Sequence, residues 1–413
     1  MNNEYQRALG RKIAFHRRSR GLSQREFARL IDRSEAWVSQ VERGVRRIDR
    51  MSVLEHVAEV LEVPLGELAA EAPLVASASE EAPGASRLRL LLSGAHSLRA
   101  VLGEHPQPDL KELRAQVDTA WQFTHEGRYV DLTDLLESLI PDLEAAVRAA
   151  TPTQRSEMFR LLAVAYQACS AALSKLGEPE AAWIATDRAI VAAERADDPL
   201  LMAAGEFRLS IVFQGARYFE QAEETSRTAA EALDRLAAEG RPEALSLWGA
   251  LTLQRAVAAA RLNRADDAYS HLARAREAAE RLGESRNDYN TEFGPTNVAL
   301  HEIAVGVELG DAGVALRTAA TVDASQLSAE RQARMLVDVA RAHTQRRQID
   351  QAVTAIEGAE AVTPEQVQGH PLVRQLVSDL LTMQDPPSLP LQGLARRLGV
   401  LPMRTGTRST RQD

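Results

Sequence analysis

The sequence predicts an all-α protein, and two observations lead to that prediction. Of the 413 residues, 45% are hydrophobic but only 4% are aromatic. The hydrophobic residues are mainly Ala and Leu rather than Val, Ile, Tyr and Phe, and Ala and Leu favour helices over sheets. Amphipathic stretches follow one another through most of the chain, separated by Gly, Asn and Pro. We therefore expect many helices and exclude an all-β fold.

Composition also restricts the compartment and the chemistry. No run of about 18 apolar residues is present, and the first 20 residues are polar and basic, so neither a membrane helix nor a signal sequence is expected. A single cysteine, Cys169, can form neither an internal disulfide nor a Cys-rich zinc site. These features predict a cytoplasmic protein that needs no metal and no cofactor.

Charge is distributed unevenly along the chain. Between Arg7 and Arg50 there are 13 basic and 5 acidic residues, whereas the whole chain has a net charge of −9. A basic segment joined to an acidic body predicts that only one end binds a polyanion, because phosphate would repel the rest. Nucleic acid is the first candidate for that partner.

The chain divides into four parts by composition. Residues 1–70 form the basic block, and residues 71–86 are rich in Ala, Ser, Pro and Glu, as in a flexible linker. Residues 87–383 hold the long series of amphipathic helices, and residues 384–413 hold a last helix and a tail. We expect the linker to let the first domain reorient.

An internal repeat runs through the helical series. Short Gly turns are followed by pairs of Ala seven residues apart, which places both Ala on one helix face where a neighbouring helix can approach closely. Equivalent positions recur every 37 to 50 residues: Leu132, Ala182, Ala222, Ala268, Ala315 and Ala352. The copy around Ala352 is the most regular, with Ile349, Ala359 and Pro364 at the expected spacing. The pattern resembles the tetratricopeptide repeat, and this resemblance implies an α-solenoid built from helical hairpins.

The strongest local signal lies between Arg20 and Gly44. Ser23 is placed to cap a helix with Phe27, Ala28 and Ile31 on its inner side, and Ser34 is placed to cap the next helix after a tight turn. Two further helices are expected at residues 52–61 and 64–68, which would complete a five-helix domain. Residues 9–68 resemble the Cro/cI type of helix-turn-helix, also called the XRE family, through Gly21, Leu22, Ser23, Gln24, Ala28, Val38, Ser39, Glu42 and Gly44.

The resemblance implies a set of DNA-binding residues. In that family the second helix enters the major groove, so Glu35, Ala36 and Gln40 fall where base edges are read. Gln24 and Ser39 would contact phosphates, Arg33 and Arg43 flank the same face, and Ser34 begins the helix. The family's buried ion pair maps to Arg17 and Glu42, as part of the fold.

A second candidate site lies in the repeats. The segment from Arg286 to Glu302 gathers polar and aromatic residues at one inter-repeat connection, including Asn287, Tyr289, Phe293, Asn297 and His301. It is either a capped loop, with Pro295 in the first helical turn, or part of an effector site. If the repeats are aligned on their turns, the concave side of the first helices carries Gln167, Gln214, Asn297, Arg334 and Arg341. Tetratricopeptide proteins hold extended peptides on that side.

Enzyme motifs are missing. The sequence has no Walker loop, G-x-G-x-x-G, H-E-x-x-H or G-x-S-x-G, so we expect no catalytic activity. Cys169 is expected to be a buried packing residue. The whole chain resembles the XRE-type regulators with a tetratricopeptide-like sensor domain of actinobacteria, through the FGPTNVALHEIAVGVELGD and ARRLGVLP segments.

That resemblance implies a homodimeric transcription regulator that binds a pseudo-palindromic operator in double-stranded DNA. Its repeat domain would dimerise and sense a small molecule or a peptide, and the protein would be nucleoid-associated when bound to DNA. The alternative is a DNA-tethered interaction scaffold whose repeats bind a protein partner.

Overall fold

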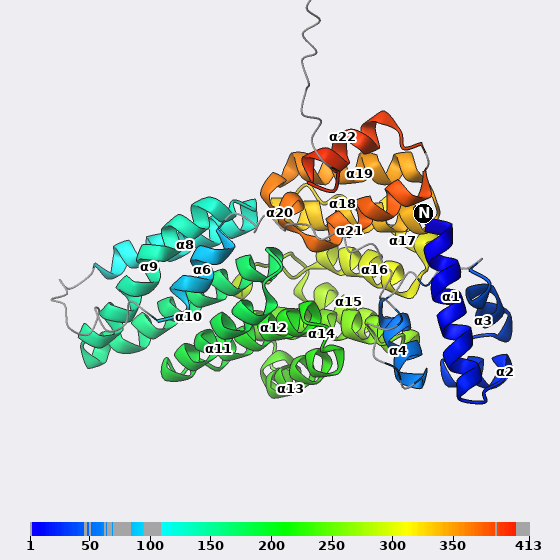
Figure 1. Cartoon of the computed structure of the whole chain (residues 1–413). Helices are drawn as coiled ribbons and strands as arrows, with labels where there is room; N and C mark the ends of the chain where they lie inside the picture. Colours follow the sequence, from blue (N-terminus) through cyan, green and yellow to red (C-terminus); the bar gives the residue numbers. More distant parts are fainter. Residues whose placement is uncertain are drawn as a thin grey trace, which may run out of the picture. The chain divides into compact units, whose positions relative to one another are not determined.

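The computed structural model describes residues 2–44, 48, 51–61, 63, 68, 84–94, 109–384 and 386–401. Over these residues the protein consists of helices, turns and one isolated β-bridge, so the all-α prediction is confirmed (Figure 1). The chain divides into two compact units, Met1–Ser79 and Glu80–Asp413. The positions 70/71 and 86/87 that composition predicts as domain boundaries stay predictions, since residues 69–83 lie outside the described part.

The described residues of the first unit form one long helix and three short ones. They are α1 (Asn2–Ser19), α2 (Gln24–Leu30), α3 (Glu35–Glu42) and α4 (Met51–Leu61). Helix α1 packs against α3 and α4, and α2 packs against α3. Their shared core contains Leu9, Ile13, Phe27, Ala28, Ile31, Val38, Val41, Leu54, Val57 and Leu61. The helix expected at residues 64–68 lies outside the described residues except for Leu68, which is buried in this core.

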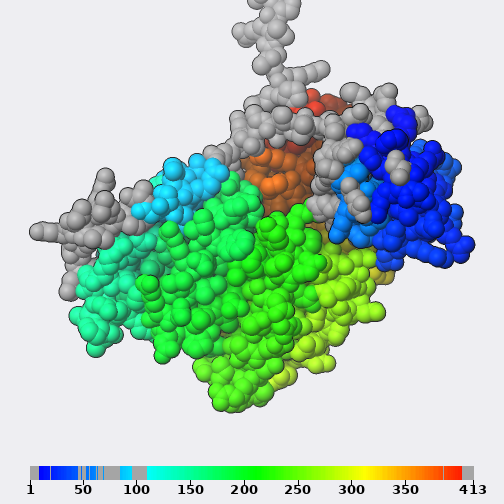
Figure 2. Space-filling model, turned by 60° about the horizontal axis from the view of Figure 1, so that its bottom comes forward, coloured from blue at the N-terminus to red at the C-terminus, as the bar shows by residue number. Residues whose placement is uncertain are grey.

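The second unit begins with α6 (Ala85–Leu91) and continues as six helical hairpins within residues 110–362. The pairs are α8 (Leu110–Glu126) and α9 (Tyr129–Ala149), α10 (Pro152–Lys175) and α11 (Pro179–Arg195), α12 (Pro199–Gly215) and α13 (Phe219–Ala238), α14 (Pro242–Arg261) and α15 (Ala265–Leu282), α16 (Pro295–Leu309) and α17 (Ala312–Ala319), and α18 (Ala329–Gln345) and α19 (Ile349–Val362). Figure 2 shows the successive hairpins as adjoining bands of colour from cyan to yellow. This is the helical solenoid that the repeats predict.

The alanines of the repeat make the close helix contacts that their spacing predicts. Each of the paired positions Ala182 and Ala189, Ala222 and Ala229, Ala268 and Ala275, and Ala352 and Ala359 is buried, and so is Ala315. Cys169 is fully buried in the same core, and burial raises the pKa of its thiol to about 12. A thiol that stays protonated at neutral pH packs as a small apolar group.

The solenoid returns to its own beginning. The first helices of the hairpins contact one another in order, α8 to α10, α12, α14, α16 and α18, and α18 also contacts α8. The last helices, α20 (Pro364–Gly369), α21 (Pro371–Met383) and α22 (Leu389–Arg397), follow α19. Two of them meet the early hairpins: the Tyr129 hydroxyl donates a buried hydrogen bond of 3.2 Å to Gln366 Oε1, and Pro371 lies against Gly177. The first helices therefore form a closed inner ring.

Candidate functional site

Two serine caps fix the geometry of the helix-turn-helix. Ser23 Oγ accepts from the Glu26 backbone N–H at 3.2 Å, and Glu26 Oε2 accepts from the Ser23 N–H at 2.8 Å, which is a capping box at the start of α2. Ser34 Oγ accepts from the Trp37 N–H at 3.1 Å at the start of α3. Both caps confirm the prediction, and Asp32 takes the left-handed φ of 51° in the turn between the helices.

A buried ion pair anchors α3 to α1. Arg17 Nε donates to Glu42 Oε1 at 2.5 Å and Nη2 to Oε2 at 3.0 Å, while Nη1 donates to the Leu22 carbonyl at 2.6 Å. Burial alone raises the pKa of Glu42, but hydrogen bonds from Arg17 and Gln24 outweigh it and hold the pKa below its ordinary value. The carboxylate is therefore charged at neutral pH and locks the orientation of α3. The pairing of Arg17 with Glu42 is as the resemblance implies.

The outer face of α3 is open to a partner. Glu35, Ala36 and Arg43 are exposed, Ser39 and Gln40 are half-buried, and Val38 and Val41 point into the core. Ser34 is exposed, although its oxygen already accepts the cap hydrogen bond. The half-buried Arg33 lies over the Trp37 ring, 5.9 Å from its centroid. Gln24 donates to Glu42 Oε2 at 2.7 Å. Ser34, Arg33 and Gln24 therefore have structural roles, while Glu35, Ala36, Ser39, Gln40 and Arg43 form the outer face of α3.

A hollow of about 610 Å³ widens this face toward α1. It is lined by Arg11, Ala14, Phe15 and Arg18 of α1, Gln24 of α2, and Ser39, Glu42 and Arg43 of α3. Arg11 and Arg18 are exposed cations beside predicted DNA-binding residues, and sequence reasoning missed them. The available signal was their helical spacing, since residues 11, 14, 15 and 18 share one side of a helix.

The second candidate site centres on the connection between α15 and α16. A β-bridge between Arg286 and Phe293, with the Arg286 N–H donating to the Phe293 carbonyl at 2.8 Å, closes the loop at its base. Its short 3₁₀ turn η1 spans Asp288–Asn290, and Tyr289, Asn290 and Glu292 all have φ between 51° and 57°. We call residues 286–294 the inserted segment. Three left-handed residues that are not glycine cost conformational energy, which tertiary contacts must offset.

Inward-facing side chains of three hairpins hold the inserted segment by its backbone. Arg208 Nη2 donates to the Asn290 carbonyl at 2.5 Å, Arg331 Nη2 to the Thr291 carbonyl at 3.2 Å, and Asn297 Nδ2 to the Glu292 carbonyl at 2.8 Å. Arginine and amide donors on a solenoid can hold a bound peptide in the same way. Here they hold a stretch of the same chain.

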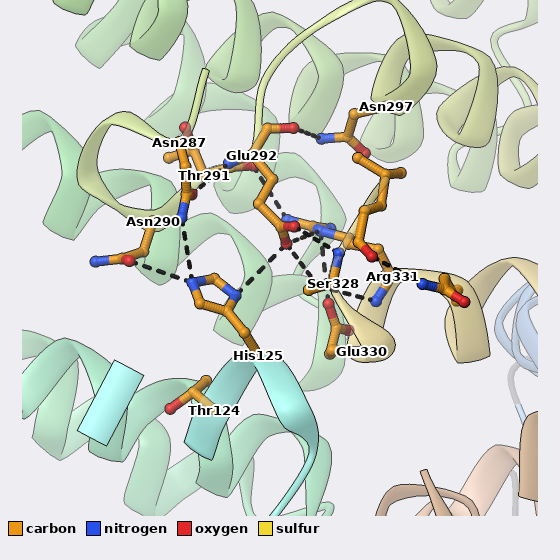
Figure 3. A network of polar contacts seen from close by, with 12 residues as sticks. Thr124, His125, Asn287, Asn290, Thr291, Glu292, Asn297, Ser328, Glu330 and Arg331 are labelled. Atoms are coloured by element: carbon orange, nitrogen blue, oxygen red, sulfur yellow. Dashed lines mark hydrogen bonds and ion pairs between the residues drawn. The ribbon is translucent and has the colours of Figure 1, made fainter. Parts of the chain in front are cut away.

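Glu292 ties the inserted segment to the first and sixth hairpins (Figure 3). Its carboxylate accepts from the Ser328 N–H at 3.0 Å, the Ser328 hydroxyl at 2.8 Å and Arg331 Nε at 3.3 Å, and lies 3.6 Å from His125 Nδ1. Burial by itself raises the pKa of Glu292, but His125, Arg331 and the Ser328 backbone lower it to about 2. His125 Nε2 also lies 3.2 Å from Asn290 Oδ1. Sequence reasoning missed Arg208, Ser328 and Arg331 because nothing local distinguishes them.

The predicted ligand residues have three different surroundings. Phe293 is fully buried, and its ring fills the space beside Gly249, where a Cβ would lie 2.1 Å from the ring. Gln167 and Gln214 are buried and donate to the Leu201 carbonyl at 3.3 Å and to Gln254 Oε1 at 2.9 Å. The others lie on or beside the inserted segment or on the inner faces of α16 and α18: Asn287, Tyr289, Asn297, His301, Arg334 and Arg341.

Charged side chains crowd the inner ring near these residues. Arg341 pairs with Glu308 at 3.2 Å and with Asp338 at 2.9 Å, and Arg261 Nε lies 3.3 Å from Glu308. Glu330 forms an ion pair with Lys175 and lies 3.5 Å from Arg331. Opposite charges outweigh burial and lower the pKa of Glu308 to about 2, so this carboxylate stays ionised at neutral pH. Within the described residues no group of three His, Cys, Asp or Glu side chains could hold a metal ion.

Comparison with known proteins identifies the first unit. Residues 8–72 match the family described as "Helix-turn-helix domain", so this unit is a helix-turn-helix domain. No curated protein matches the chain. Among the described residues, no helix has the length and apolar character needed to cross a bilayer.

The solved structures that match this chain include two complexes. One is Bacillus thuringiensis PlcR in complex with the peptide PapR7 and DNA, which is 15% identical, covers 67% of this chain and 92% of its own, and has a TM-score of 0.27. The other is a Rap protein complexed with Competence and Sporulation Factor, which is 14% identical, covers 87% of this chain and 100% of its own, and has a TM-score of 0.46.

Proposed function

We propose that this protein is a sequence-specific regulator of transcription that binds double-stranded DNA through α3 and senses an effector through its helical repeats. The observation that carries the first part is the helix-turn-helix match over residues 8–72, joined to an exposed outer face on α3. Glu35, Ala36 and Gln40 read base edges, while Arg33, Arg43, Gln24, Ser34 and Ser39 position the helix on the phosphates. Arg11 and Arg18 extend the phosphate contacts from α1.

Selection of bound sequences from a random DNA pool tests this assignment. Gln40→Ala should change the preferred base at one position in each half-site, at a cost of about 1–3 kcal/mol for a lost bidentate contact. Arg43→Ala should weaken binding to all sequences alike and reduce the salt dependence, as loss of a phosphate contact does. An unchanged base preference in Gln40→Ala would refute the placement of α3.

We propose that the active species is a homodimer on a pseudo-palindromic site, because one small head buries too little DNA for tight specific binding. An exposed aromatic cluster on the second unit supports a contact between copies. Trp183 is 42% exposed and Tyr218 is 50% exposed, and the Trp183 ring stacks edge-on against Phe213 with centroids 4.9 Å apart. Large exposed apolar patches mark interaction surfaces.

The exposed aromatic cluster around Trp183 also supports the alternative function of an interaction scaffold, because a protein partner could cover the cluster instead of a second copy of this chain. Native mass spectrometry of protein purified from its own host distinguishes them. A dimer that Trp183→Ser converts to monomer supports the regulator. A stoichiometric second protein that Trp183→Ser releases supports the scaffold.

The effector part of the proposal places a small molecule or a peptide at the inner ring, near Asn297, His301 and Arg334. What supports it is that hydrogen-bonding groups for a chain segment converge there from several hairpins. The test measures operator binding with and without host extract. The extract should change the affinity for DNA of the wild type, and an unchanged affinity would contradict the sensing role.

A further inference from the structure

One arginine of the inner ring forms no direct ion pair, unlike its neighbours on the same helix. Arg331 and Arg341 lie on α18 on either side of Arg334, and both pair with carboxylates. Arg334 makes no hydrogen bond and no ion pair with any described residue, although it is half-buried. Burial and the charge of Arg331 lower its pKa, while the carboxylates of Asp338 and Glu330 act in the opposite direction. A partly buried cation without a partner costs stability, and an anion would remove that cost.

Two buried acceptors on the neighbouring helix α16 are also unpartnered. His301 and Asn297 are each 2% exposed, and they lie one helical turn apart on α16. His301 Nδ1 lies 2.8 Å from the Asn297 carbonyl, so Nδ1 carries the proton and Nε2 offers a lone pair. Neither Nε2 of His301 nor Oδ1 of Asn297 has a hydrogen-bond partner. Buried polar atoms normally have one, so each unpaired atom calls for an explanation.

The helix that carries His301 and Asn297 adjoins the helix that carries Arg334. Burial lowers the pKa of His301 well below its ordinary value, and the charge of Arg334 is the next largest cause. Helices α16 and α18 are in direct contact. A donor for an anion and two acceptors for N–H or O–H groups therefore lie on two adjoining first helices of the inner ring.

We propose that Arg334, His301 and Asn297 form a binding site for an oxyanion ligand that also carries N–H or O–H donors. A carboxylate or a phosphate group pairs with Arg334, and donors on the same ligand fill His301 Nε2 and Asn297 Oδ1. A peptide carboxyl end and a small phosphorylated metabolite both have this chemistry. The inference rests on the proposed sensing role and gives the effector a chemical class.

The probes are succinate and inorganic phosphate, each titrated into the full chain while thermal unfolding is followed. Sodium chloride holds the ionic strength constant, and succinamide serves as the uncharged counterpart of succinate. A ligand that binds only the folded state raises the melting temperature in a saturable way. Wild type should show this rise with at least one oxyanion and not with succinamide, and the probe that works tells carboxylate from phosphate.

Arg334→Gln should move the midpoint of that titration to at least tenfold higher concentration. Without a probe, this variant should melt at the same temperature as wild type or higher, because it removes an unpaired cation. Arg334→Lys should keep part of the effect. Arg227→Gln is the matched control, since Arg227 lies on α13, pairs with Glu224 and Glu231, and should leave the titration unchanged.

The absence of a saturable rise in wild type, or an identical midpoint in Arg334→Gln, would overturn the site. This outcome is separable from the sensing role. If host extract changes operator binding equally in wild type and Arg334→Gln, sensing stands and the oxyanion site is wrong. If oxyanions bind at Arg334 but extract never changes operator binding, the site stands and the sensing role fails.

Discussion

Replacement of Glu292 by Gln should destabilise the second unit by an amount that depends on pH. The carboxylate is 11% exposed and joins the inserted segment to Ser328, Arg331 and His125. Its surroundings lower its pKa from 4.5 to about 2. The pKa of Glu292 is therefore about 2.5 lower in the folded state than in the unfolded state. This difference means that the charged carboxylate stabilises the fold by about 3 kcal/mol relative to a neutral group.

The sign follows from proton uptake. The folded pKa is lower than the unfolded one, so the contribution of Glu292 is complete above pH 4.5 and disappears as the pH falls toward 2. We expect Glu292→Gln to lower the free energy of unfolding by about 3 kcal/mol at pH 7 and by only about 1.4 kcal/mol at pH 3. Urea unfolding of both proteins at pH 7, 5, 4 and 3 measures the difference.

The control is Glu224→Gln, which removes an exposed carboxylate paired with Arg227. Exposed ion pairs contribute little to stability, so this variant should be nearly neutral. If Glu292→Gln costs less than about 0.5 kcal/mol at pH 7, or costs the same at pH 3 as at pH 7, Glu292 does not hold the inserted segment in place.

Two further outcomes are expected. Gly10→Ala puts a Cβ 2.4 Å from the Val41 carbonyl oxygen, so α1 must move away from α3. Operator binding in a gel-shift assay should then be lost, while the circular dichroism of the solenoid is kept. Full operator binding by this variant would contradict the close packing of α1 on α3. Burial lowers the pKa of His271 and His370 to about 4 and that of His301 well below 6.5, so the folded state binds fewer protons than the unfolded state. As the pH is lowered from 6.5 to 4, the free energy of unfolding should therefore decrease by up to about 1.4 kcal/mol per pH unit for each histidine. Equal urea midpoints at pH 7.5 and 5 would refute this.

Local patterns in the sequence were sufficient for much of the fold. Ser23 and Ser34 occupy cap positions that depend on residues three places away, and the Ala pairs depend on a spacing of two helical turns. Each of these signals lies within one helix or one turn, so the chain's own periodicity shows it. The outer face of α3 could be predicted for the same reason.

The closed inner ring could not be predicted in this way. Its contacts join residues far apart in sequence, such as Tyr129 with Gln366 and His125 with Asn290. No local pattern in the sequence encodes such pairs. Nothing near Arg208 or Arg331 in the sequence distinguishes them from other arginines, because their roles come from contacts between hairpins. The Arg286 to Glu302 segment was noticed because its polar and aromatic composition differs from the repeats. Its insertion among the first helices follows from tertiary contacts alone.

The inserted segment and the proposed oxyanion site share α18, and this makes their energetic coupling testable. Arg331 holds Glu292 and the Thr291 carbonyl, while Arg334 follows one turn later, where the charge of Arg331 repels it and lowers its pKa. An oxyanion at Arg334 screens that repulsion, which strengthens the hold of Arg331 on the segment.

Coupling free energies are reciprocal, so loosening the segment must weaken oxyanion binding by the same factor. Glu292→Gln, which leaves Arg334 intact, should therefore raise the titration midpoint for the oxyanion that wild type binds, by about five- to a hundredfold for a coupling of 1–3 kcal/mol. Glu224→Gln should leave that midpoint unchanged. If Glu292→Gln binds the oxyanion as wild type does, the segment and the ligand site act independently, and the effector must reach the DNA-binding unit by another route.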